Sequence, residues 1–207
     1  MGARREPSEG REERAFDYAR TVALSDGVFA IALTLLVLNI GVPSLAPGHH
    51  SALGHRLLDR GPELLSYAIS FAVIALLWVR HHEFFRGLAR VDARVTVLNL
   101  LYLGLVAFLP YPTRILGVYG DQPLAVALYA CTVALVALVA GLTRRHAWRG
   151  GLLSEAGRRH VAGREHWLIT PTIFLASIPV AFVSTAAGML TWSALLLVAL
   201  RQREPAR

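Results

Sequence analysis

The chain has 207 residues, of which 55% are hydrophobic and 17% are charged, and all 21 of its basic residues are arginine. Soluble domains carry about 45–50% apolar and about 25% charged residues, so this composition is typical of a membrane protein. The net charge of +7 does not indicate nucleic-acid binding, because the arginines lie at the ends of apolar segments rather than on one face of a soluble fold. We therefore expect an all-α integral membrane protein that is surrounded by lipid and binds no nucleic acid.

The apolar segments are sufficient for six membrane-spanning helices, each of which needs about 20 mostly apolar residues. Four of the segments are separate: 20–40, 62–80, 94–109 and 123–143. The segment 167–200 is too long for one span, and we expect a hairpin of two short spans with its break at 184–188. Pro43, Pro110 and Pro112 are expected to end helices, because proline lacks the backbone N–H that a helix interior needs.

The arginines predict how these spans are oriented, because cytoplasmic loops of membrane proteins carry an excess of basic residues. With both termini in the cytoplasm, 18 of the 21 arginines lie on the cytoplasmic side, and only Arg56, Arg60 and Arg114 lie outside. The chain then divides into a charged cytoplasmic N-terminus at 1–19, a six-helix membrane domain at 20–201 and a short basic tail at 202–207.

One carboxylate, Asp26, lies well inside a predicted span. An ionisable residue at membrane depth is costly and marks a functional site by default, although a position near the helix end would let it reach the interface. A helical wheel groups four other residues on one face of this span: Ile31, Thr34, Leu35 and Leu38. Asp26 lies about 140° from Ile31 on that wheel and therefore points toward neighbouring helices. In an arbitrary span, such a stripe would be a packing or lipid-facing surface.

Polar residues in the second and third spans are the candidate partners of Asp26. Trp78, His81 and His82 lie near the cytoplasmic end of the second span, and Asn99 lies in the third. Polar groups buried in a membrane must be hydrogen-bonded, so we expect a network among these side chains. The two adjacent histidines cannot share one helical face, and no cysteine or carboxylate cluster stands near them at ligand spacing, so no metal site is predicted.

Two short motifs stand out in the first and second spans. They are Arg20-x-x-x-Leu24-Ser25-Asp26, followed by the mostly apolar residues 27–38, and Trp78-Val79-Arg80-His81-His82. The first motif resembles the hallmark Arg-x-x-x-Phe-Ser-Asp of the bacterial relatives of transmembrane protein 175, the lysosomal potassium channel. The second is similar to the tryptophan and histidine pattern of the same family. Leu24 stands where the family usually has phenylalanine, whereas the serine and the aspartate are kept.

The resemblance implies a homotetramer whose four first helices line a pore for potassium, with no cofactor. It also implies that apolar side chains form the constriction in place of the carbonyl filter of ordinary potassium channels. The constriction maps to Ile31, Leu35 and Leu38, and a polar pore-lining position maps to Thr34. The first-helix motif and its hydrogen-bond network comprise Arg20, Ser25, Asp26, Trp78, His81, His82 and Asn99. The segment 117–121 has glycine and tyrosine in the wrong order for a carbonyl filter and is expected to be a loop.

Other functions stay open at this stage. A proton-coupled secondary transporter could use Asp26 as an intramembrane relay, although the sequence shows no clear internal repeat of the kind common in transporters. An enzyme would need several polar groups at one depth, and only the group around Asp26 is found, so we expect no enzymatic activity. A purely structural membrane subunit is a third alternative. The expected location is a bacterial cell membrane, because an arginine-only composition rich in alanine and leucine is typical of GC-rich bacterial genomes.

Overall fold

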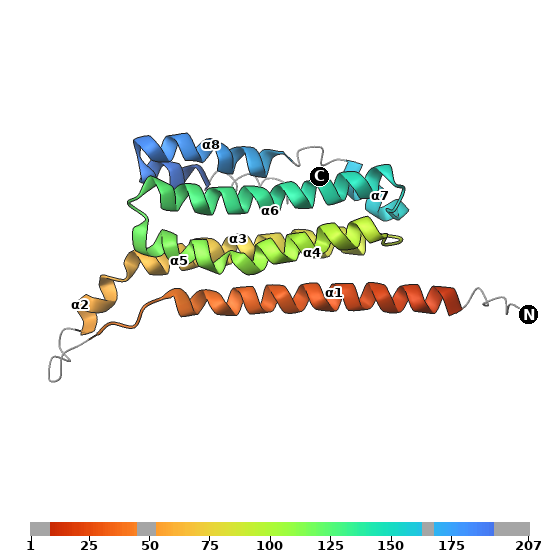
Figure 1. The fold of residues 1–207 in the computed structure, drawn as a ribbon, viewed down its shortest axis with the longest axis horizontal. Coiled ribbons are helices and arrows are strands. Elements are labelled where there is room, and N and C mark those ends of the chain that lie inside the picture. The colour runs from red at the N-terminus through yellow and green to blue at the C-terminus, as the bar shows by residue number, and fades with distance from the viewer. Residues whose placement is uncertain (1–8, 45–52, 163–167, 193–207) are drawn as a thin grey trace, which may run out of the picture.

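The computed structural model describes residues 9–44, 53–162 and 168–192, and the regular elements in these ranges are helices (Figure 1). In chain order they are α1 (Glu9–Leu35), the 3₁₀ helix η1 (Leu36–Asn39), α2 (Leu53–Leu58), α3 (Gly61–Arg86), α4 (Ala93–Phe108), α5 (Pro110–Tyr119), α6 (Pro123–Arg149), α7 (Glu155–Ala162) and α8 (Ile169–Val183). Residues 185–192 form a further helical stretch after α8.

The residues at the helix ends explain where several of these helices begin. α3 and α6 carry proline in their first turn, at Pro62 and Pro123, where the missing N–H costs no hydrogen bond. α4 follows Asp92, whose carboxylate accepts from the backbone N–H of Val95 at 2.8 Å, as the side chain of an N-cap residue does. Local sequence therefore determines the start of three of the long helices.

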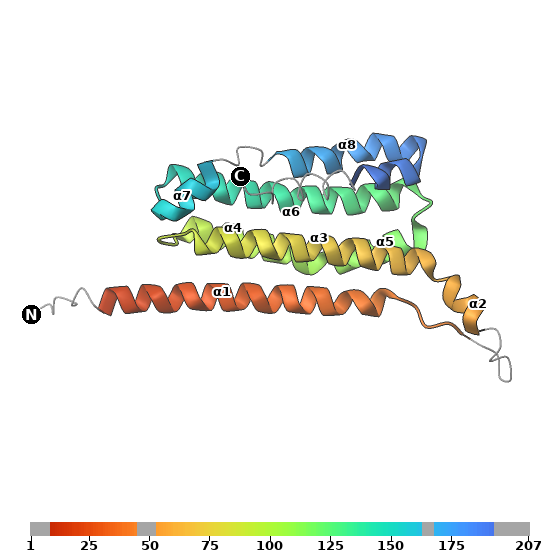
Figure 2. The same cartoon turned by 180° about the vertical axis from the view of Figure 1, so that it is seen from behind.

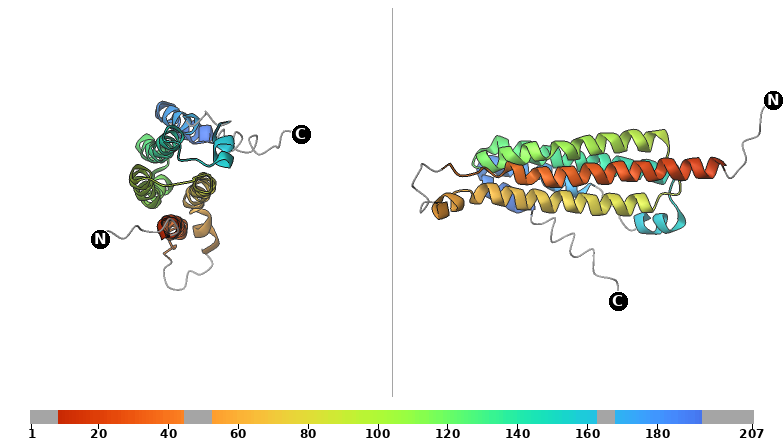
Figure 3. Two further views of the ribbon diagram at one scale, coloured as in Figure 1. Left: turned by 90° about the vertical axis from the view of Figure 1, so that its right-hand side faces the viewer. Right: turned by 90° about the horizontal axis from the view of Figure 1, so that it is seen from below.

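The long helices run along a common axis in three layers. α1 lies along one edge of the bundle, α3, α4 and α5 form the middle layer, and α6 and α8 form the opposite edge (Figures 1 and 2). The view along the helices in Figure 3 also places α1 at the outside. α1 packs against α3 and α4, so only one side of this helix is covered by the bundle.

Among the residues that the structure describes, four helical segments are long and apolar enough to cross a membrane: Tyr18–Asn39, Gly61–Arg86, Ala93–Tyr119 and Pro123–Arg149. These segments support a multi-pass membrane protein and correspond to the first four predicted spans. The predicted C-terminal hairpin is represented by α8, a shorter apolar helix of 15 residues, and by 185–192. Most of its second span, the basic tail at 202–207 and residues 1–8 of the N-terminal segment lie outside the described residues.

The third predicted helix ends as expected, because α4 stops at Phe108 just before Pro110, but the apolar span does not end there. Pro110 is the first residue of α5, and α4 and α5 together form one candidate span of 27 residues, separated only by Leu109. A proline in the first turn of a helix removes only an N–H that would have no partner within that helix. The residues 117–119, expected in a loop, consequently lie in the last turn of α5.

The C-terminal hairpin turns at Ser184, inside the predicted break. Ser184 is extended, with φ −155° and ψ 116°, between α8 and the helical residues 185–192. The two arms pack closely, because a Cβ built on Gly188 would lie 2.9 Å from the Cβ of Ala181. The indole of Trp192 donates to the hydroxyl of Ser177 at 2.9 Å, which joins the arms in the core beside α6.

At the opposite end of the bundle, the loop between α3 and α4 binds the loop between α6 and α7. The backbone N–H of Ala89 donates to the carbonyl of Leu152 at 2.8 Å. The backbone N–H and the hydroxyl of Ser154 both donate to the carbonyl of Gly87, at 2.9 and 3.0 Å. We call residues 87–92 together with residues 150–157 the clasp.

A second, small core lies beneath the clasp and reaches α1. Its buried members are Phe84, Phe85, Val95, Ala147, Leu152 and Leu153. The hydroxyl of Tyr18 on α1 donates to the carbonyl of Phe85 at 2.9 Å. Asp92 adds a link to α6, because His146 Nε2 lies 2.7 Å from its carboxylate. Partial burial would raise the pKa of Asp92, but the Val95 N–H and His146 hold it below its ordinary value.

Gly157→Ala is expected to open the clasp. A Cβ at this position would lie against the carbonyl oxygen of Gly87, with the carbonyl carbon 2.8 Å away. The Gly87 carbonyl cannot move aside without losing its hydrogen bonds to Ser154. We expect tryptic cleavage after Arg158 in α7 to become at least ~10-fold faster, because the free energy of local opening falls.

The matched control is Gly104→Ala in α4, where an added Cβ would meet nothing within 4 Å. This variant should keep the wild-type cleavage rate and gain slightly in thermal stability, since alanine is favoured over glycine within a helix. Equal cleavage rates in the two variants would show that the contact between Gly87 and Gly157 does not hold α7 in place.

Candidate functional site: the first helix and its supports

The two faces of α1 differ sharply in burial. Four residues spaced by about one helical turn face the bundle and are at most 1% exposed: Ser25, Phe29, Ala32 and Leu36. On the opposite side Ile31, Leu35 and Leu38 are 60%, 42% and 72% exposed. The apolar stripe predicted from the sequence is therefore not a packing surface within one protomer.

The change from α1 to η1 brings two residues of this stripe closer to alignment. In a regular α-helix, Leu35 and Leu38 would be separated by about 60° around the axis. A 3₁₀ helix has three residues per turn, so residues at i and i+3 eclipse. Leu35 is the residue before η1 and Leu38 is its third residue. The two side chains thus stand at successive levels about 6 Å apart on one side of the helix.

Thr34 lies beside the stripe, and its hydroxyl is oriented by the helix backbone. Its Oγ1 is 3.0 Å from the carbonyl oxygen of Ala30 and 2.9 Å from that of Ile31. A hydroxyl has one hydrogen and two lone pairs. Because the hydrogen points back to the helix, the lone pairs of Thr34 are directed toward the exposed side.

The buried face of α1 is bonded to α4 and α3 through Asn99. The hydroxyl of Ser25 donates to the carbonyl of Thr21 at 2.8 Å and accepts from Asn99 Nδ2 at 3.2 Å. Asn99 Oδ1 lies 2.8 Å from His81 Nε2. Ser25 and Asn99 are 0% and 3% exposed, so this chain of hydrogen bonds lies in the interior of the bundle.

The order of donors and acceptors along these hydrogen bonds indicates which ring nitrogen of His81 carries a hydrogen. Since the Ser25 hydrogen is directed to Thr21, Ser25 can only accept from Asn99. The amide nitrogen of Asn99 therefore faces Ser25 and its oxygen faces His81. An amide oxygen cannot donate, so His81 must carry a hydrogen on Nε2. The ring is held in this orientation by stacking on Phe85, with ring centroids 4.4 Å apart.

Asp26 is bonded separately, on the flank of α1 that faces α3. Trp78 Nε1 donates to Asp26 Oδ1 at 2.9 Å, and the ring of Trp78 stacks on that of His82, with centroids 5.6 Å apart. Arg20 lies on the exposed surface of the same helix. The residues that the sequence grouped into one network therefore form two separate sets of contacts: Ser25, Asn99 and His81 in one, and Asp26, Trp78 and His82 in the other.

The C-terminal end of the first span is held by residues that the sequence did not single out. Asn39 Nδ2 donates to the carbonyl of Pro110 at 2.8 Å. The backbone N–H of Gly41 donates to Glu63 at 2.6 Å, and Arg60 pairs with the same carboxylate at 2.6 Å. A polar residue at the end of an apolar run was the only signal for Asn39, and Glu63 looked like an ordinary first-turn acid.

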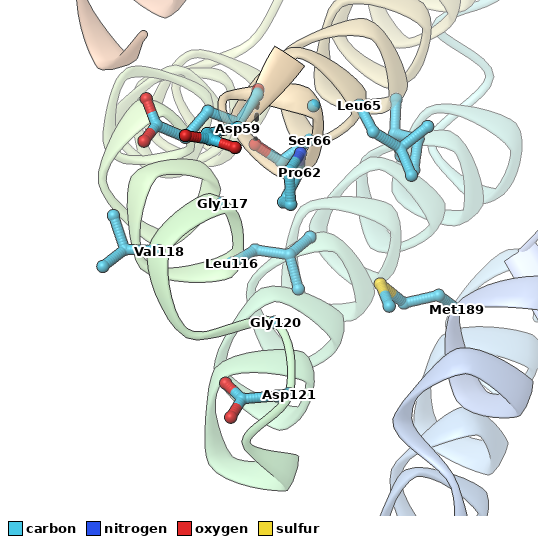
Figure 4. Close-up of a pocket in the computed structure, with 13 residues that line it drawn as sticks. Asp59, Pro62, Leu65, Ser66, Leu116, Gly117, Val118, Gly120, Asp121 and Met189 are labelled. Atoms are coloured by element: carbon cyan, nitrogen blue, oxygen red, sulfur yellow. Dashed lines mark hydrogen bonds between the residues drawn. The ribbon is translucent and has the colours of Figure 1, made fainter. Parts of the chain in front are cut away.

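A cavity of about 610 Å³ lies at this end, between the start of α3, the end of α5 and the residues around Met189 (Figure 4). Its walls include Leu65 and Leu116, and Asp59 and Asp121 also line it. None of the site residues expected from the sequence lines this cavity. The candidate site is therefore the exposed side of a helix and its supports, rather than this pocket.

Comparison with known proteins supports the resemblance to the transmembrane protein 175 family, both in the part of the chain that carries the motifs and in the fold. A family model described as endosomal/lysosomal potassium channel TMEM175 matches residues 20–110. A potassium channel of Streptomyces collinus is 42% identical over 130 residues, which are 62% of this chain and 62% of that protein. A potassium channel of Chamaesiphon minutus is 37% identical over 171 residues, which are 80% of this chain and 84% of that protein.

Animal relatives are longer than this chain. The human endosomal/lysosomal proton channel TMEM175 is 33% identical over 182 residues, which are 80% of this chain and 35% of that protein. The crystal structure of a lysosomal potassium-selective channel TMEM175 homolog from Chamaesiphon minutus superposes with a TM-score of 0.78 at 32% identity, over 91% of this chain and 99% of that one. The helix bundle, the supported first helix and these matches together show that this chain belongs to the TMEM175 family of ion channels.

Proposed function

We propose that this protein is a potassium-permeable channel in which the first helices of several copies line the pore. The observation that carries the proposal is the arrangement of α1 at the edge of the bundle. One face of α1 is buried against α3 and α4, whereas the apolar stripe on its other side is exposed. A single α1 cannot enclose a pore, so the bare stripe supports an oligomer, and the family resemblance supports a homotetramer.

The constriction in this proposal is formed by Ile31, Leu35 and Leu38. Several apolar side chains that close on one axis exclude water, and an ion without its hydration shell meets a steep barrier there. The alignment of Leu35 with Leu38 by η1 would stack two such rings. Conduction then requires that the rings widen or become partly hydrated.

The membrane topology that we propose has six spans and both termini in the cytoplasm. Four candidate spans and the short hairpin that follows them support this count. Exposed arginines gather at the clasp end, among them Arg86, Arg145 and Arg149, which agrees with a cytoplasmic location for this end. The proposed location is the cell membrane of a bacterium, as the names of the two bacterial relatives suggest.

The permeant ion is the point on which the relatives' names differ. Those of the two bacterial relatives say potassium channel, and that of the human relative says proton channel. The bacterial relatives have a higher percentage of identical residues in their alignments, 42% and 37% against 33% for the human relative, so we propose potassium. The comparisons do not favour a proton-coupled carrier, and the structure pairs its supposed relay, Asp26, with Trp78.

A flux assay tests the proposal and separates the two ions. The purified protein is placed in liposomes loaded with potassium, and a pH-sensitive dye reports proton entry that balances potassium efflux. We expect dye quenching only after a protonophore is added, because the channel itself carries potassium. Quenching without the protonophore would indicate a proton pathway, and no quenching with it, in liposomes that respond to valinomycin, would contradict the channel.

Thr34→Ala is expected to lower the permeability ratio of potassium to sodium about fivefold. The hydroxyl lone pairs that face the exposed side are lost, and one hydrogen-bond-like contact of about 1 kcal/mol corresponds to such a factor. Reversal potentials in mixed potassium and sodium solutions measure the ratio. The matched control is Thr132→Ala in α6, which removes the same kind of hydroxyl bond to its own helix, at 2.8 Å to Leu128. Equal ratios in both variants would remove Thr34 from the pore.

A further inference from the structure

The clasp brings exposed arginines from four parts of the chain to one end of the bundle. Six of them are Arg86, Arg90, Arg145, Arg149, Arg158 and Arg159. The exposed acidic residues near them are Glu83 and Glu155, and the second of these lies 3.8 Å from Arg159. The excess of basic residues in cytoplasmic loops of membrane proteins explains the positive charge of these loops. It does not explain why α7 is fixed beside the ends of α3 and α6.

The position of α7 results from contacts that leave it little freedom. Gly157 is packed against the Gly87 backbone, Leu152 and Leu153 are each 5% exposed, and Ser154 bonds to Gly87. The side chain of Arg158 lies over the turn after α6, where a Cβ on Gly151 would be 3.5 Å from its Nη2. The guanidinium group of Arg158 therefore lies close to Gly151, the second residue after the end of α6.

The last turns of α6 have the side chains that favour a membrane interface. Arg145 and Arg149 lie about one helical turn apart, and Trp148, between them in the sequence, is 46% exposed. Tryptophan is enriched at the level of lipid headgroups, because its ring is apolar and its N–H is polar. α3 ends at Arg86 and α6 ends at Arg149, so this surface lies where two candidate spans leave the apolar part of the bilayer.

We infer that Arg149, Arg158 and Trp148 form a binding site for the headgroup of an anionic phospholipid in the cytoplasmic leaflet. The guanidinium groups would bind the headgroup phosphate, and the exposed indole ring would pack beside the upper part of the acyl chains. The partner is a lipid rather than a soluble polyanion, because the site lies at the end of spans and includes an exposed aromatic ring. Lipid binding does not depend on the channel activity proposed above.

Native mass spectrometry of the full chain in detergent tests the site, with phosphatidylglycerol and phosphatidylcholine added in turn. We expect wild-type protein to bind phosphatidylglycerol more tightly than phosphatidylcholine. The double variant Arg149→Gln/Arg158→Gln should bind phosphatidylglycerol about 25-fold more weakly, since each arginine near an anionic lipid contributes about fivefold. The matched control Arg56→Gln/Arg114→Gln removes the same charge at the other end and should bind like the wild type.

Gly157→Ala distinguishes a lipid site that depends on the position of α7 from nonspecific attraction to a basic surface. The substitution displaces α7 and keeps every arginine. We expect it also to weaken phosphatidylglycerol binding, whereas general attraction to a basic end would leave binding unchanged. The inference is overturned if Arg149→Gln/Arg158→Gln binds as the wild type does, or if the Arg56→Gln/Arg114→Gln control loses as much affinity. It is also overturned if glycerol phosphate competes as well as the lipid, since a soluble anion would then be sufficient.

Discussion

Leu35→Asn and Ile31→Asn are each expected to raise single-channel conductance several-fold and to reduce discrimination among cations. Both side chains lie on the bare side of α1. An amide in each copy would supply oxygens and water to an ion that otherwise crosses a ring of apolar side chains. The barrier set by desolvation would fall, and so would the selectivity that accompanies it. Single-channel recordings in planar bilayers measure both quantities.

The matched control for these variants is Leu101→Asn in α4. Leu101 is 53% exposed and is apolar like Leu35, but it belongs to a helix that is not expected to line the pore. This variant should conduct like the wild type. Unchanged currents in both Leu35→Asn and Ile31→Asn would remove these residues from the constriction and leave the stripe as a lipid-facing or packing surface.

Asn99→Leu is expected to destabilise the bundle more than any other single change in the candidate site. The substitution leaves the Nε2–H of His81 without its acceptor and removes the donor to Ser25, whose hydroxyl keeps only its bond to Thr21, in a region where both Ser25 and Asn99 are buried. Each orphaned buried polar group costs about 1–3 kcal/mol. We expect a lower melting temperature in detergent and loss of current, because α1 is no longer fixed to α4.

A double-mutant cycle separates this network from the neighbouring one. Ser25→Ala and Asn99→Leu share a hydrogen bond, so their effects on the free energy of unfolding should be strongly non-additive. Trp78→Phe removes the hydrogen bond to Asp26 and keeps an aromatic ring beside His82, so its effect should add independently to that of Asn99→Leu. Additive effects for Ser25 and Asn99 would contradict the hydrogen-bond chain as described.

The periodicity of apolar residues along the first span was the strongest sequence signal, and it located the exposed apolar face of α1. The wheel that grouped Ile31, Leu35 and Leu38 needs only the regular advance of a helix, which local sequence determines. It also directed Asp26 toward neighbouring helices, where the structure pairs it with Trp78. The wheel could not show that η1 tightens the end of the span, because no residue in 36–39 requires a 3₁₀ turn.

Contacts between distant segments that carry no motif were beyond the reach of sequence reasoning. The clasp depends on the meeting of Gly87 and Gly157, and neither glycine carries a local signal for the other. Tyr18 was assigned to a charged N-terminal segment, yet its hydroxyl bonds to Phe85. Pro110 was interpreted as the end of a span, because the sequence alone does not show that the helix beginning at this proline continues the span.

The reversal potential under bi-ionic conditions tests the central claim most directly. Purified protein is placed in a planar bilayer with potassium on one side and sodium on the other. A potassium-permeable channel predicts a current that reverses well toward the potassium equilibrium potential, and this value should move toward zero in Leu35→Asn. A current that reverses near zero in the wild type, or no current in bilayers that contain correctly folded protein, would contradict the account.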